Sequence, residues 1–227
     1  MMWAMVRVEC RGILFDLDGV LIDSNAAVDR VWNVWAREHE LNAAEVIHKA
    51  HGRPSIATVR EYIADEAAAQ AEHKELVRRE IADIEGIVPM RGALKLLGSL
   101  ALEQWAIVTS GTYELATTRI KAAGLPMPKN LVTSSDIVNG KPFPEPYLKG
   151  AAKLGVPAAD CIVVEDAGTG VRAGKAAGAR VIGVRSVTIP DAELLEAGAD
   201  WFVQDCSAIT VEPGANTNRI VLAVQTL

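Results

Sequence analysis

Six short apolar runs, rich in β-branched residues, recur along the chain with helical patterns between them. They are "GILFD" (12–16), "WAIVTS" (105–110), "NLVTS" (130–134), "CIVVED" (161–166), "RVIGV" (180–184) and "DWFVQ" (200–204). Strands that alternate with helices predict βαβ units and a parallel sheet. Several runs are apolar on both faces, as expected for strands that helices cover on each side. The pattern therefore predicts an α/β fold, a Rossmann-like doubly wound parallel sheet.

The alternation stops between Ser24 and about Pro89, where the chain is rich in Ala and Glu and shows no convincing strand. Apolar residues recur there at i, i+3, i+4 and i+7, the stripe of an amphipathic helix packed on a core: Val28, Val31, Trp32 and Trp35. We therefore interpret this segment as a helical insertion after the first strand.

The insertion gives two predicted parts, a helical cap of residues 23–87 and a catalytic core of residues 1–22 and 88–227. An insertion at this point lies above the carboxyl ends of the strands, where open α/β sheets bind ligands. We expect the cap to act as a lid, with hinges near residues 21–24 and 88–92. The tail, residues 207–227, contains a Pro/Gly/Asn turn and one apolar run and is expected to add an edge strand.

Composition narrows the classes of partner. The 227 residues, half of them apolar, can bury a sizeable core in one domain or two small ones. A net charge of −6, without a long Lys/Arg run, argues against nucleic acid and anionic membranes and favours a small-molecule partner. No window approaches ~18 uninterrupted apolar residues, so no membrane span is expected. The protein is expected to act as a monomer or small homo-oligomer.

Cysteine usage bears on the compartment. The three cysteines are far apart and form no C-x-x-C pattern: Cys10, Cys161 and Cys206. This arrangement supports neither a disulfide framework nor a zinc site. A reducing, cytoplasmic location fits best.

Carboxylates crowd the end of the first predicted strand. Asp16, Asp18 and Asp23 lie within eight residues of one another in "DLDGVLIDS". Asp23 is explained as a cap of the helix that is expected to start near Ala26. Asp16 and Asp18 are two residues apart, so a strand would aim both to one side, where like charges repel. They require a cation, a shared proton or a charged substrate.

Polar residues also follow three other predicted strands. They are Thr109 and Ser110 after "WAIV", Lys141 in "VNGKPFPEPY", and Glu165 with Asp166 after "CIVV". The ends of parallel strands lie along one edge, so these groups can converge with the aspartates. Two facing acid clusters form an oxygen-rich site, which selects Mg²⁺ rather than zinc. A lysine and hydroxyls beside it would hold phosphoryl oxygens.

A glycine-rich segment, residues 163–178, offers a competing interpretation as a nucleotide-binding loop. The G-x-G-x-x-G spacing fails because position 173 is Ala173, and two acids directly before it would repel a pyrophosphate. We interpret the glycines as positions of tight helix–sheet packing. A second segment, "HGRPS" (51–55), is predicted to form a break between two helices. A loop that contacts the substrate and a plain surface loop are equally supported there.

Four segments together resemble the motifs of the haloacid dehalogenase superfamily, specifically its phosphatases with a helical cap. They are "DLDGVLIDS", "VTSGT", "NGKPFPEPYLKG" and "VVEDAGTGVRAGKAAGARVIGV", in the family's order and spacing. The resemblance spans all but the last twenty or so residues. Within the superfamily the chain looks most like the sugar-phosphate and polyol-phosphate phosphatases.

The resemblance implies a role for each motif residue. Asp16 would be the nucleophile that becomes an aspartyl phosphate, and Asp18 the acid and base for leaving alcohol and water. The other implied roles are phosphoryl binding by Thr109 and Lys141, backbone amides from Ser110 and Gly111, and substrate contact by His51 and Arg53. Mg²⁺ would be held by the Asp16 carboxylate, the Asp18 backbone carbonyl, Asp166 and Glu165.

Two other functions remain open from the sequence. A phosphomutase of the β-phosphoglucomutase kind has the same motifs but returns the phosphoryl group to the sugar. A non-catalytic sugar-phosphate-binding protein would keep the scaffold without turnover. Dehalogenation is disfavoured, because dehalogenases of this superfamily lack the second Asp of the D-x-D pair.

Overall fold

The computed structural model describes residues 4–50, 54–186, 189–212 and 219–227. In this part of the chain a six-stranded parallel sheet has the order β6-β5-β2-β7-β8-β9. Its strands are β2 (Gly12–Phe15), β5 (Trp105–Val108), β6 (Leu131–Val132), β7 (Cys161–Glu165), β8 (Arg180–Val184) and β9 (Trp201–Val203). The six apolar runs of the sequence are these six strands, so the predicted parallel sheet is confirmed.

The strand order shows that the sheet is doubly wound. Within this sheet the first strand in sequence is the central β2, and the chain then runs outward through β5 to β6 before it crosses to the other side for β7, β8 and β9. The direction of winding therefore reverses at β2, between β5 and β7. A crevice for ligands is expected at the carboxyl ends of the strands at such a reversal.

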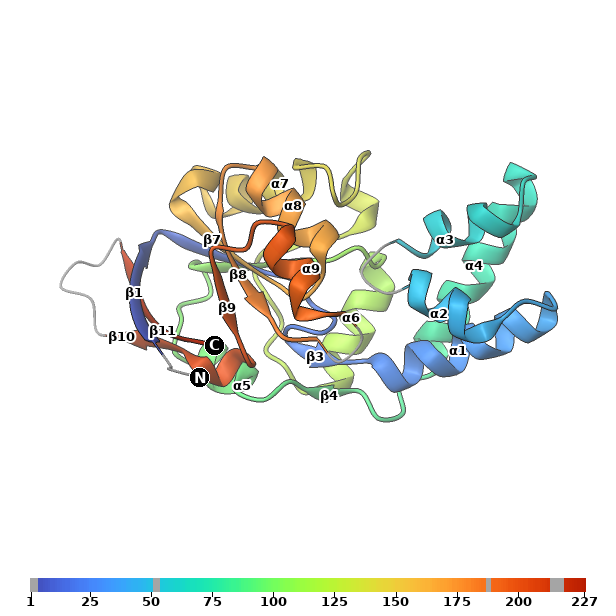
Figure 1. Ribbon diagram of the computed structural model, residues 1–227, viewed down its shortest axis with the longest axis horizontal. Helices are drawn as coiled ribbons and strands as arrows, with labels where there is room; N and C mark the ends of the chain where they lie inside the picture. Colours follow the sequence, from blue (N-terminus) through green and yellow to red (C-terminus); the bar gives the residue numbers. More distant parts are fainter. Residues whose placement is uncertain (1–3, 51–53, 187–188, 213–218) are drawn as a thin grey trace.

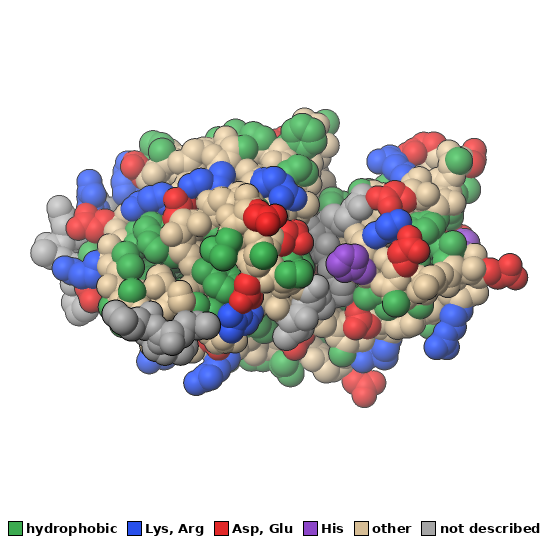
Figure 2. Space-filling model, in the orientation of Figure 1, with side chains coloured by type: hydrophobic (Ala, Val, Ile, Leu, Met, Phe, Trp, Pro, Cys, Tyr) green, Lys and Arg blue, Asp and Glu red, His purple; other side chains and the backbone are tan. Residues whose placement is uncertain are grey.

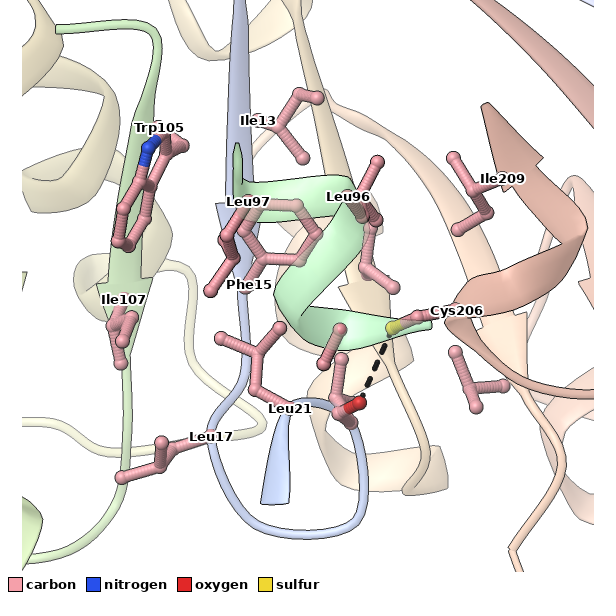
Figure 3. Close-up of a cluster of buried hydrophobic side chains, with 14 of the residues drawn as sticks. Ile13, Phe15, Leu17, Leu21, Leu96, Leu97, Trp105, Ile107, Cys206 and Ile209 are labelled. Carbon is pink, nitrogen blue, oxygen red and sulfur yellow. Dashed lines mark hydrogen bonds between the residues drawn. The ribbon is translucent and has the colours of Figure 1, made fainter. Parts of the chain in front are cut away.

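Helices cover both faces of this sheet, because alternate side chains of each strand point to opposite faces. On one face, Ile13 and Phe15 of β2 pack with α5 (Ala93–Gly98) and α6 (Tyr113–Ala122). Figure 3 shows Phe15 near Trp105 with Leu96 and Leu97 above the strands; the Phe15 and Trp105 ring centroids are 6.4 Å apart. Leu14 faces the other side, toward α7 (Glu145–Leu154), α8 (Gly168–Ala176) and α9 (Asp191–Glu196).

The described part of the predicted insertion forms four helices, α1 (Asn25–Glu38), α2 (Ala43–Ala50), α3 (Ser55–Tyr62) and α4 (Glu66–Ala82). They share a hydrophobic cluster of their own and project from one end of the molecule (Figure 1). The predicted stripe of α1 is buried in that cluster at Val31, Trp32 and Trp35. The chain enters and leaves through β3 (Ile22–Asp23) and β4 (Val88–Pro89), which pair with each other antiparallel.

The first cap helix begins slightly earlier than expected. Its first residue is Asn25, and Ser24 occupies the N-cap position without a side-chain capping bond. Asp23 nevertheless satisfies the first helical amide, because its Oδ1 accepts from the Asn25 backbone N–H at 3.1 Å. The explanation of Asp23 as a helix-start residue therefore holds. Ser24 is left with its hydroxyl available for another partner.

The tail does add an edge strand, but to a second sheet rather than to the parallel one. Strands β10 (Ile209–Glu212) and β11 (Ile220–Thr226) join the N-terminal strand β1 (Ala4–Cys10) in a separate antiparallel sheet, ordered β1-β11-β10. The middle strand β11 has both backbone edges paired, with β1 and β10, and so cannot extend the parallel sheet. Its buried side chains instead join the core cluster beneath α5.

Short 3-10 turns complete the described part of the fold, at Ser134–Asp136, Ala158–Asp160 and Cys206–Ala208. The three cysteines are free and buried, and the Cys206 thiol donates to the Val20 carbonyl at 3.2 Å (Figure 3). Among the described helices, none has the length and apolar character needed to cross a membrane.

Candidate active site

The predicted strand-end residues come together at the carboxyl edge of the sheet, at the reversal of winding. Asp16 follows β2, Thr109 follows β5, and Glu165 ends β7, and these strands are direct neighbours. Lys141 reaches the same point from the segment before α7. All four side chains are buried. The expectation that these distant residues converge is met by their positions.

Lys141 is the cation at the centre of this arrangement. Its Nζ donates to Asp16 Oδ1, to Glu165 Oε1 at 2.6 Å, and to the Val108 carbonyl at 3.2 Å. Burial acts to lower the pKa of Lys141, but the facing carboxylates outweigh it and raise the pKa above its ordinary value. The ammonium therefore stays charged and ties two strand ends together.

Glu165 is held on both of its oxygens. Oε1 also accepts from the Tyr147 hydroxyl at 2.5 Å, and Oε2 accepts from the backbone amides of Asp166 and Ala167 at 3.1 and 3.3 Å. A Cβ at Gly170 would overlap the Glu165 carboxylate, so helix α8 can approach only with glycine there. Gly174 similarly lets α8 pack on Val163 and Val181, as predicted for this glycine-rich segment.

A cluster of buried carboxylates forms a potential metal site. Ligand oxygens of Asp16, Glu165 and Asp166 lie within 4.8 Å of one another. Burial raises the pKa of Asp16 to about 8, and the neighbouring acids Glu165 and Asp18 add to the rise while Lys141 opposes it. Burial, and after it the charges of Glu165 and Asp16, raise the pKa of Asp166 well above its ordinary value. Three carboxylates face one ammonium, and a divalent cation would balance the excess negative charge.

The Asp18 carboxylate lies outside that cluster and has its own partners. Its Oδ1 accepts from the Ser24 hydroxyl at 2.6 Å and from Arg119 Nη1 at 2.9 Å. Arg119 Nη2 in turn donates to Glu80 Oε1 at 3.3 Å. The implied metal contact of Asp18 is through its backbone carbonyl, which stays a prediction.

Three residues at the site were not predicted: Tyr147, Arg119 and Glu80. Tyr147 lies in the same short segment as Lys141, "KPFPEPY". Its closeness to Lys141 in the sequence could have marked it as a candidate site residue. Arg119 follows Leu115 by four residues and Glu80 follows Leu76 by four, which places both on the buried faces of their helices. Helical spacing therefore marked them as buried charges, although it did not identify their partners.

The loop after β5 supplies the remaining predicted contacts. Thr109 is buried, and its Oγ1 accepts from the Gly111 backbone N–H at 3.1 Å. Thr112 caps α6, with its hydroxyl oxygen accepting from the Leu115 backbone N–H. The Gly111 amide would have to exchange its partner to donate to a phosphoryl oxygen. His51 and Arg53, predicted to contact substrate, lie outside the described residues.

A cavity of about 110 Å³ connects these groups to the cap. Its floor contains the strand-end residues Asp16, Thr109, Lys141, Glu165 and Asp166. Its upper wall comes from the cap, with Ser24, Asn25, Val28, Trp32, Ala50, Ser55 and Glu80. Figure 2 shows a notch at its upper edge between the two parts, with basic and acidic side chains interspersed over this face. The site is a partly open, acid-lined pocket rather than a basic surface.

A hydrolase-type site at the edge of a doubly wound sheet agrees with the family comparison. Residues 10–178 match the haloacid dehalogenase-like hydrolase family. The chain belongs to this family.

Named relatives narrow the class further. The chain is 46% identical to hexitol phosphatase A of Escherichia coli (strain K12) over 183 residues, covering 79% of this chain and 85% of that protein. It is 34% identical to glycerol-1-phosphate phosphohydrolase 2 of Saccharomyces cerevisiae over 218 residues, covering 91% and 86%. The crystal structure of a hydrolase from Pseudomonas syringae superposes with a TM-score of 0.77 at 30% identity, covering 86% and 94%. The resemblance to sugar- and polyol-phosphate phosphatases is thereby confirmed.

Proposed function

We propose that this protein is a Mg²⁺-dependent phosphomonoesterase that hydrolyses small phosphorylated sugars or polyols through an aspartyl phosphate. The observation that carries the proposal is the cluster of Asp16, Glu165 and Asp166 at the sheet edge, which lines the cavity. Lys141 binds two of these carboxylates, those of Asp16 and Glu165. Excess negative charge here suits a divalent cation, and the cation with Lys141 suits a phosphate.

Asp16 is the proposed nucleophile. Its carboxylate lines the cavity, and its Oδ1 is fixed by Lys141. Attack of an Asp16 oxygen on phosphorus forms the acyl phosphate and breaks the bond to the alcohol oxygen. Asp18 gives a proton to that oxygen and, once the alcohol has left, removes one from the attacking water. Water then attacks phosphorus, inorganic phosphate leaves, and Asp16 is regenerated.

Lys141 and the loop after β5 are proposed to hold the phosphoryl oxygens. Lys141 Nζ lies at hydrogen-bond distance from both Asp16 and Glu165, so it is fixed next to the atom that attacks. Thr109 contributes a hydroxyl and Ser110 with Gly111 contribute backbone amides, all lining the same cavity. Fixed donors of this kind stabilise charge on the equatorial oxygens without reorganisation.

Mg²⁺ is the proposed cation because all the offered ligands are hard oxygens. Asp16, Asp166 and the Asp18 backbone carbonyl would hold it, with Glu165 assisting directly or through water. When bound, the ion neutralises charge on the transferred phosphoryl group. Gly19, at a φ of +80°, leaves no room for a Cβ next to the Asp166 carboxylate, so the chain passes close to this ligand.

The substrate class and the lid are proposed from the cap. The relatives are named hexitol phosphatase and glycerol-1-phosphate phosphohydrolase, and cap residues line the cavity beside the proposed nucleophile, where a leaving group would lie. We propose that residues 23–87 form the cap and that segments 21–24 and 88–92 are its hinges. The antiparallel pairing of β3 and β4 supports this, because both connections cross side by side.

Phosphate release from a panel of sugar, polyol and nucleotide monophosphates tests the proposal, with Mg²⁺ and with chelator. Chelator-sensitive release that favours polyol and sugar phosphates is the expected result. Isomerisation of β-glucose 1-phosphate without release of phosphate would replace the proposal with the phosphomutase. Tight binding of sugar phosphates without turnover in Mg²⁺ would replace it with the binding protein.

A further inference from the structure

A buried arginine links the core to the cap. Arg119 belongs to core helix α6 and is only 5% exposed, and Glu80 belongs to cap helix α4 and is also 5% exposed. The guanidinium donates to Asp18 through Nη1 at 2.9 Å and to Glu80 through Nη2 at 3.3 Å. One rigid group therefore connects a carboxylate of the D-x-D pair with a carboxylate of the cap.

The arrangement is costly, which argues against a purely structural pair. Taking the charged groups of Arg119 and Glu80 out of water has a large desolvation cost, and a buried ion pair often contributes little net stability. The Asp18 side chain keeps 32% of its surface exposed. Arg119 Nε is buried and has no hydrogen-bond partner among the described residues. Leaving a buried donor unpaired adds to that cost. The guanidinium is therefore placed so that it binds both carboxylates, although its Nε–H is left without a hydrogen-bond partner among the described residues.

Besides Arg119, a second side chain binds the Asp18 carboxylate, and it lies where the chain enters the cap. Ser24 is buried at the N-cap position of α1, yet its hydroxyl donates to Asp18 Oδ1 at 2.6 Å rather than capping the helix. Ser24 also lies in the segment where the chain enters the cap. Asp18 Oδ1 is thus linked to the cap twice, directly through Ser24 and indirectly through Arg119, whose other amino group binds Glu80.

We propose that Arg119 is a positioning residue that couples closure of the cap to the placement of the Asp18 carboxylate. Glu80 fixes the guanidinium only while α4 lies against α6, and the fixed guanidinium holds Asp18 Oδ1. Movement of the cap away from the core removes Glu80 and leaves Asp18 less constrained. The inference rests on the proposed role of Asp18, and it predicts an effect on turnover rather than on substrate binding.

Glu80→Gln tests the coupling with little change in shape. The variant weakens a hydrogen bond between charged groups. We therefore expect kcat to fall roughly tenfold, with KM changed by less than about threefold. The matched control is Glu75→Gln on the same helix, which breaks ion pairs with Arg78 and Arg79 outside the cavity. It should leave kcat unchanged.

Arg119 variants separate positioning from structure. Arg119→Lys keeps the charge but cannot bridge two carboxylates in a fixed fork, so it should recover thermal stability relative to Arg119→Met without recovering kcat. In a double-mutant cycle, Glu80→Gln should cause no further loss of kcat in the Arg119→Met background. Additive losses in the cycle, or full kcat in Arg119→Lys, would overturn the inference.

Hydrogen exchange gives a readout that does not need turnover. Glu80→Gln should speed amide exchange in residues 17–24, whereas Glu75→Gln should not. Unchanged exchange and unchanged kcat in Glu80→Gln would refute the coupling while leaving an active wild type, and hence the proposed phosphatase, intact. A wild type that turns over nothing, with exchange still accelerated by Glu80→Gln, would refute the phosphatase alone.

Discussion

The floor and the upper wall of the cavity are built on different principles. The floor comes from the ends of adjacent strands, and its groups are locked by short contacts around Lys141, Glu165 and Tyr147. The wall comes from the separately packed cap and is mixed. Apolar Val28, Trp32 and Ala50 lie there beside polar Ser24, Asn25, Ser55 and Glu80. The strand ends keep the charged groups of the floor in fixed positions. The cap helices pack in a cluster of their own, so they can move relative to the floor and tolerate other side chains. We therefore expect the floor to determine the reaction and the wall to determine which substrates react.

Asp18→Asn should cause a large loss of turnover. Proton transfer by a placed acid contributes about 10²- to 10⁴-fold, so kcat should fall by roughly that factor while KM changes little. Steady-state kinetics on the best substrate measures it, with Asp160→Asn, an exposed residue paired with Arg11, as the control. A loss below about tenfold in a folded variant would remove Asp18 from the acid–base role.

Metal and pH should act together on the stability of the floor. The pKa of Asp16 is about 8 in the folded protein against an ordinary 3.8, so between these values the folded state retains a proton that the unfolded state has lost. Without metal, the free energy of unfolding should therefore fall as pH rises from about 4 to about 8, by up to about 1.4 kcal/mol per pH unit for each such proton.

Saturating Mg²⁺ should flatten this dependence, because the ion replaces the proton, and should raise the melting temperature. Urea unfolding across that pH range, with Mg²⁺ and with chelator, measures both effects. Asp16→Asn is the matched variant and should show a smaller slope without metal. Identical slopes with and without Mg²⁺ would contradict a cation site at these carboxylates.

Tyr147→Phe sharpens the account of the floor. It deletes the hydroxyl that donates to Glu165 Oε1 and keeps the buried ring. The loss should be about 1–2 kcal/mol of unfolding free energy, with kcat lowered several-fold through a less constrained Glu165 and Lys141. Tyr113→Phe, on an exposed ring, is the control and should change neither quantity. Equal stability of Tyr147→Phe and wild type would show that this bond does not fix the floor.

Ser55→Ala tests the wall and should have the smallest effect. Ser55 lines the cavity from α3, and its hydroxyl lies 2.9 Å from His73 Nδ1. Loss of one neutral hydrogen bond should raise KM about 2- to 10-fold for hydroxyl-rich substrates and leave kcat nearly unchanged. Comparing KM over the substrate panel measures this. A fall in kcat with constant KM would place Ser55 with the reaction and break the division between floor and wall.

Much of the floor could be predicted from the sequence because it follows from local rules. Apolar runs fixed the strands, and parallel strands bring residues that follow them to one edge, which places Asp16, Thr109 and Glu165 together. The N-terminal strand could also have been predicted, because Val6, Val8 and Cys10 alternate with charged residues in the period of a half-buried strand.

The wall and its links could be predicted far less well. Glu80 and Arg119 are 39 residues apart and belong to different helices, so their contact depends on how α4 packs against α6. Local spacing shows that each is buried, but a pairing between helices is a tertiary property. Similarly, the tail forms a separate sheet because its partner β1 comes from the opposite end of the chain.

Trapping the phosphoryl group on Asp16 tests most directly whether the reaction proceeds through an aspartyl phosphate. Enzyme mixed with its best substrate is quenched with acid within one turnover and treated with borohydride, which reduces an acyl phosphate and leaves homoserine at that position. Peptide mass spectrometry should find this mark at Asp16 in the wild type and not in Asp16→Asn, which should also release no phosphate. A mark at another residue, or undiminished phosphate release by Asp16→Asn, would contradict the account.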